Sequence, residues 1–122
     1  MKILFALLLC AAGLSQAQVR EGDFTIRFEP KAVLQTNAPI PFEITVKDDL
    51  GKPLIQAKVT LQIEMANHVH TQVYKAPAVS PGVYVAKPVF PESGDWDVYV
   101  EVRRNDQMSA RTIQFHVPEE AP

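Results

Sequence analysis

Apolar and polar residues alternate with a period of two through much of the chain, and this pattern restricts the fold more than any other feature. Its clearest run places Trp96, Val98, Val100 and Val102 on one parity and polar residues on the other. Such alternation predicts strands with one face in a core and one in water. The chain has 10 prolines, all beyond residue 17, and helix signals are nearly absent there. The sequence therefore predicts an all-β protein.

About seven strands are expected, separated by turns rich in Gly, Pro, Asn and Asp. They cover residues 24–29, 42–47, 57–65, 70–75, 83–89, 95–103 and 108–117, with a short extended piece at 32–34. Strands at this spacing are typical of a single Ig-like antiparallel β-sandwich with Greek-key connections. Trp96 is the expected anchor of its core, because a buried indole contributes a large apolar area.

The N-terminus has the pattern of a signal peptide. Lys2 supplies a positive charge, residues 3–14 are apolar, and small residues at positions 15 and 17 predict cleavage before Gln18. The alternative is an uncleaved anchor, although a membrane span needs about 20 apolar residues. We therefore predict a signal peptide at 1–17, a β-sandwich domain at 18–117 and a solvated tail at 118–122. The mature chain would be periplasmic or secreted, with no membrane span.

Composition excludes several functions for the mature chain. The only cysteine, Cys10, lies in the predicted leader, so a disulfide, a thiol nucleophile and a Cys-ligated zinc are excluded. The net charge of −2 becomes about −3 without Lys2, which disfavours nucleic acid, whose binding is dominated by phosphate neutralisation. No nucleophile motif surrounds any serine. We therefore predict that the protein is not an enzyme.

Residues 65–70 are the candidate site, because Met65, His68 and His70 gather there. If the strand continued, Met65 would point inward and both imidazoles outward, about 7 Å apart on one face. A turn or bulge at residues 66–67 would instead bring Met65 to the same side. Imidazole suits Cu(II), Zn or Ni, and a thioether suits Cu(I). The alternative is that both histidines, like His116 on the last strand, are polar surface and that Met65 packs in the core.

The order of several short elements resembles the YtkA-like/FixH-like exported domains. These elements are Asp49-Leu50-Gly51-Lys52-Pro53, Ala57-Lys58-Val59, Met65, Pro81-Gly82-Val83-Tyr84 and Gly94-Asp95-Trp96, within a resemblance that spans Phe24 to Val117. Many members carry Met-Pro-x-Met-x-His where this chain has Met65-Ala66-Asn67-His68-Val69-His70. Met65 and His70 match that segment, whereas Ala66 and His68 replace the proline and the second methionine. Glu92 replaces a methionine that many relatives have two residues before the glycine of the Gly-x-Trp element.

The resemblance implies a role in copper binding, or in supplying metal to respiratory or efflux systems. Replacing Met by His moves the expected preference from Cu(I) towards Cu(II) or zinc. The predicted ligands are Met65, His68 and His70, with Glu92 or Met108 assisting. The alternative function is a metal-free Ig-like module that binds an envelope or membrane protein partner through an edge strand or an exposed face.

Overall fold

The computed structural model describes residues 20–67 and 70–119. This part of the chain contains nine β-strands: β1 (Arg20–Glu21), β2 (Thr25–Pro30), β3 (Phe42–Lys47), β4 (Lys58–Met65), β5 (Thr71–Lys75), β6 (Ala78–Ser80), β7 (Val83–Ala86), β8 (Gly94–Arg104) and β9 (Gln107–Val117). Among the described residues there is no helix of the length and apolarity that crossing a membrane requires.

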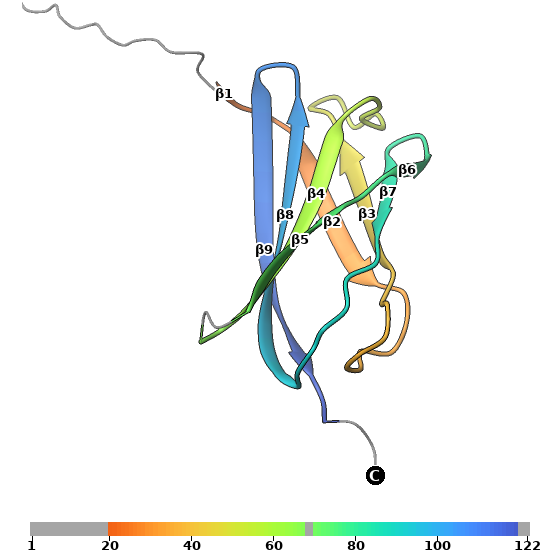
Figure 1. The fold of residues 1–122 in the computed structure, drawn as a ribbon. Coiled ribbons are helices and arrows are strands. Elements are labelled where there is room, and N and C mark those ends of the chain that lie inside the picture. Colours follow the sequence, from red (N-terminus) through yellow and green to blue (C-terminus); the bar gives the residue numbers. More distant parts are fainter. Residues whose placement is uncertain (1–19, 68–69, 120–122) are drawn as a thin grey trace, which may run out of the picture.

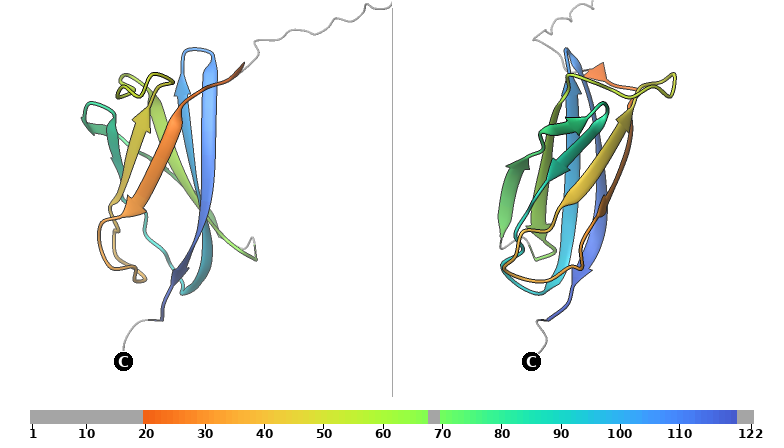
Figure 2. Two further views of the ribbon diagram at one scale, coloured as in Figure 1. Left: turned by 180° about the vertical axis from the view of Figure 1, so that it is seen from behind. Right: turned by 90° about the vertical axis from the view of Figure 1, so that its right-hand side faces the viewer.

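The strands form two sheets that face each other (Figures 1 and 2). One sheet has five strands in the order β1-β9-β8-β4-β5, and the other has four in the order β2-β3-β7-β6. Neighbouring strands pair antiparallel, except that β1 pairs parallel with β9. The prediction of an all-β sandwich is confirmed.

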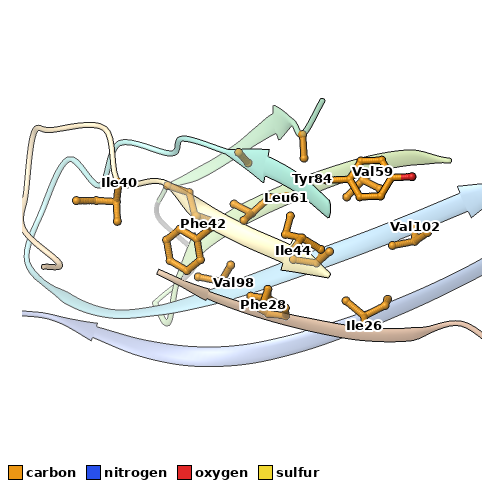
Figure 3. Close-up of a cluster of buried hydrophobic side chains, with 14 of the residues drawn as sticks. Ile26, Phe28, Ile40, Phe42, Ile44, Val59, Leu61, Tyr84, Val98 and Val102 are labelled. Carbon is orange, nitrogen blue, oxygen red and sulfur yellow. The ribbon is translucent and has the colours of Figure 1, made fainter. Parts of the chain in front are cut away.

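The core lies between the sheets and follows the predicted alternation. On β4 the residues from Val59 to Met65 at every second position are buried, and β8 alternates in the same way. Trp96 is fully buried, with its ring edge-to-face on Phe90 at 5.4 Å between ring centroids, so it is the core anchor that the sequence predicts. Figure 3 shows side chains of both sheets meeting in this core. No buried residue within the described ranges is polar or charged.

The strands differ from the predicted ones where a proline ends the pairing or where a strand is very short. The predicted strand 83–89 ends at Ala86, because Pro88 lacks the N–H that a ladder needs. Residues 32–34 are not a strand, and β5 begins at Thr71 rather than at residue 70. Strands β1 and β6 have two and three residues, which is too short for a periodicity of two to reveal them.

The chain changes sheets between β5 and β6. Ala76 is buried at this crossing, and its N–H donates to the carbonyl of Val59 at 2.9 Å. Strand β5 is thus an edge of the five-stranded sheet, and β6 is an edge of the four-stranded sheet. Figure 1 shows the connection running from one layer to the other. Two edge strands consecutive in sequence therefore belong to different sheets.

Candidate metal site at one end of the sandwich

A turn after β4 places Met65 and His70 opposite each other. Glu64 pairs with Thr71, and the N–H of Met65 donates to the carbonyl of His70 at 3.0 Å. Residues directly opposite on antiparallel strands share a face of the sheet. The strand does not continue past Met65, because the chain turns at residues 66–67, so the predicted alternative, in which a turn brings Met65 and His70 to the same side, is the one observed. His68 lies outside the described residues.

The imidazole of His70 is held between a carboxylate and an indole. Its Nε2 lies 2.5 Å from Oε2 of Glu92, and its ring stacks on Trp96 with 6.4 Å between centroids and 26° between planes. The indole N–H of Trp96 donates to the backbone carbonyl of Glu92 at 2.9 Å. Trp96 thus supports both members of the pair. The side chains of His70 and Glu92 are 40% and 54% exposed, so an ion in solution can reach them.

The thioether of Met65 approaches the same end of the sandwich from inside. Met65 pairs with Trp96 across β4 and β8, and its exposed fraction is 9%. Its methyl group lies against Gly94, the first residue of β8. Met65 is therefore a core residue whose thioether lies at the same end of the sandwich as His70, its backbone partner across the turn.

Met108 lies far from these residues. It pairs with Arg103 near the start of β9, whereas Met65 pairs with Trp96. Arg103 is seven positions beyond Trp96 on β8, which corresponds to about 23 Å at about 3.3 Å per residue. The prediction that Met108 assists the site is wrong, because the β8–β9 hairpin carries it to the other end of the sheet. Of the two residues predicted to assist, Glu92 is the one that contacts His70.

His116 makes a similar histidine–carboxylate pair on the outer face. Its Nδ1 lies 2.8 Å from Oδ1 of Asp95, its direct neighbour across β8 and β9. Both side chains are largely exposed, as expected for the polar face. Because Trp96 points into the core, Asp95 next to it points outward. This second pair matches the first in chemistry but lacks a neighbouring thioether.

Three side chains with metal-binding chemistry thus come from three segments to this end of the sandwich: the thioether of Met65, the imidazole of His70 and the carboxylate of Glu92. No three His, Cys, Asp or Glu side chains converge on a metal position within residues 20–67 and 70–119. A three-donor set from the described residues thus requires Met65. The sequence pointed to these ligands but gave no signal for Trp96, whose stacking on His70 depends on the β4–β8 register.

An antiparallel sandwich with a Met/His/Glu cluster at one end defines a small Ig-like β-sandwich module. A model of the YtkA-like family matches residues 16–101, and the chain belongs to this family. The comparison with curated proteins found no match.

Proposed function

We propose that this protein is an exported, non-catalytic YtkA-like module that binds copper, or zinc as the alternative, in metal handling or respiratory-oxidase assembly. The observation that carries the proposal is the pairing of Met65 with His70 beside the Glu92 carboxylate. His68, two residues before His70 in the sequence, is the proposed additional ligand.

In this proposal Glu92 orients the imidazole. Nε2 of His70 faces Oε2 of Glu92. Metal-binding histidines commonly donate one ring N–H to a carboxylate, which fixes the tautomer and makes the other nitrogen more basic. The carboxylate of Glu92 accepts a hydrogen bond from Nε2–H, and Nδ1 is then the nitrogen that binds the ion.

The donor set favours an ion of intermediate softness. Imidazole and carboxylate suit Cu(II) and zinc, while the thioether suits Cu(I). Because Met65 is largely buried and His70 is not, the ion meets the imidazole nitrogen before the sulfur. We therefore propose tighter binding of Cu(II) or zinc than of a purely thioether-bound Cu(I).

The test is titration of the purified chain with Cu(II), Zn and Cu(I). The chain has one tryptophan, and its indole stacks on His70, so Cu(II) at the site should quench its emission. We expect His70→Ala to weaken Cu(II) binding at least tenfold, and Met65→Leu to weaken Cu(I) binding more than zinc binding. Affinity should also fall below about pH 6, because the ligands bind metal only when deprotonated.

The matched control is His116→Ala, which removes an exposed histidine from the equivalent pair with Asp95. This variant should bind metal as the wild type does. If His70→Ala binds as tightly as the control, or if both variants lose affinity equally, the proposed site is wrong.

A further inference from the structure

An apolar groove opens where β5 leaves β4 and crosses to the other sheet. Its volume is about 450 Å³. Its apolar wall is formed by Ala57, Val59, Ala76, Pro77, Ala78 and Tyr84. Figure 3 shows Val59 of β4 and Tyr84 of β7, one from each sheet, at the same end of the core. The groove therefore lies on the edge of the sandwich that carries β5 and β6, away from the candidate metal site.

Two lysines line the rim of this groove. Lys58 and Lys75 are exposed, and neither ammonium forms an ion pair or hydrogen bond with the described residues. The nearest acidic influence is Glu101, whose pKa is lowered mainly by its hydrogen bond with Arg103 and only weakly by Lys58. The chain as a whole carries a net charge of −2, so this rim has the opposite sign. An occupant with small apolar and acidic side chains complements the groove.

The C-terminal segment of this protein has that composition. Residues 118–122 read Pro-Glu-Glu-Ala-Pro, and the carboxylate of Glu119 is exposed without a partner among the described residues. A short segment with two prolines loses little conformational entropy when it binds in an extended form. The segment is thus suited to a narrow apolar groove with a basic rim.

The segment cannot reach the groove of its own chain. It follows Val117, which pairs with Gly94 at one end of β8, whereas Lys58 pairs with Arg103 near the other end. These positions are about 30 Å apart along the strand. Three residues from Val117 to Glu120 extend about 11 Å at most. Figure 1 shows the end of β9 and strand β6 at opposite ends of the sandwich.

We propose that the groove binds the C-terminal segment of a second copy of this chain. Two copies that lie side by side and antiparallel bring each tail to the groove end of the other. The two contacts are then identical, and the contact closes as a two-fold dimer rather than an open filament. The same arrangement covers Val73 on β5 and Val79 on β6, each 62% exposed on the groove edge.

Sedimentation velocity with a chelator present tests the dimer without metal-induced association. We expect the wild-type chain to dimerise and the dimer to weaken with salt, because rim charges are screened. Lys58→Glu combined with Lys75→Glu should raise the dissociation constant of the dimer about tenfold or more. Both substitutions turn an attraction between the groove rim and the acidic tail into a repulsion. Glu119→Lys combined with Glu120→Lys should have the same effect.

Mixing the two charge-reversed variants supplies the decisive control. In the mixture, each acidic groove meets a basic tail and each basic groove meets an acidic tail, so heterodimers should form at near wild-type affinity. A synthetic Val-Pro-Glu-Glu-Ala-Pro peptide should compete with the wild-type dimer. A chain that stays monomeric at about 0.5 mM, or a mixture that does not restore association, would overturn the proposal. Peptide binding by a monomeric chain would also overturn it, because the occupant would then be another protein.

Discussion

A Cβ atom on Gly94 would lie 3.3 Å from the methyl carbon of Met65. This close approach connects the start of β8 with the soft donor of the candidate metal site. Gly94 also has a φ of 131°, in a region that residues with side chains rarely adopt. One residue therefore provides both a backbone conformation that favours glycine and the space that the thioether occupies.

Gly94→Ala should destabilise the fold and displace Met65. We expect a loss of about 1–3 kcal/mol in the free energy of unfolding from backbone strain, measured by urea denaturation. Cu(I) affinity should fall as well. The control is Gly51→Ala, which has a φ of 80° and no atom within 4 Å of the added carbon. That variant should lose stability only. If Cu(I) binds equally to both variants, Gly94 does not position Met65.

Trp96→Ala should cost about 3–5 kcal/mol, because it removes a fully buried ring from the core. Trp96→Phe keeps most of the apolar contact but loses the hydrogen bond to the Glu92 carbonyl, so its cost should be smaller. Urea denaturation followed by circular dichroism measures both, since the variants lack the fluorescent residue. A cost below about 1 kcal/mol for the alanine variant would show that Trp96 is not the core anchor.

Glu92→Gln tests how the carboxylate acts on His70. Substituting an outer-shell partner of a metal-binding histidine typically costs ten- to a hundredfold in affinity. The glutamine carbonyl can still accept a hydrogen bond from Nε2–H, so Glu92→Ala should weaken Cu(II) binding further than Glu92→Gln. Asp95→Asn is the matched control, because Asp95 holds His116 in the equivalent pair. Equal affinities for all three variants would exclude Glu92 from the site.

The Glu101–Arg103 pair should contribute to stability in a pH-dependent way. Nε of Arg103 donates to Glu101 at 2.6 Å, and this bond, with a second from the Tyr99 hydroxyl, lowers the pKa of the carboxyl. A carboxyl whose pKa is lowered in the folded state stabilises the fold at pH values above its unfolded-state pKa of about 4.3. That contribution is lost as the pH falls through the folded-state pKa. The urea midpoint should therefore drop on acidification.

A double-mutant cycle isolates the pair. Glu101→Gln should remove the acid-dependent loss that this carboxyl causes, Arg103→Gln should remove the part that depends on the arginine, and the double variant should remove no more than Glu101→Gln alone. The coupling should stay below about 1 kcal/mol, because both side chains are partly exposed. Additive effects of the two substitutions on the acid dependence would show that the residues titrate independently.

The alternation of apolar residues was enough to predict the long strands. Strands β4, β8 and β9 were placed to within one residue because eight to eleven residues of clean periodicity define each of them. Strands β1 and β6 left no such signal. The sheet to which each strand belongs depends on long-range pairing, which a local pattern does not contain.

The site was predicted in part for the same reason. Met65 and His70 are five residues apart, and a local turn decides their contact, so the sequence held both alternatives. Met108 was misplaced because only the register of the β8–β9 hairpin reveals that it lies beside Arg103. The bond between His70 and Glu92 spans 22 positions and depends on three strands packing together. The family resemblance nominated Glu92, but only the fold brings it to the imidazole.

The β8–β9 hairpin has a consequence for the order of folding. Two strands of 11 residues each are joined through Asn105 and Asp106 alone, so their pairing closes a very short loop. The contact between β1 and β9 joins residues 87 positions apart and must overcome a larger loss of chain entropy. The hairpin should therefore form early as the template on which the N-terminal half docks, and substitutions within it should slow refolding more than substitutions near β1.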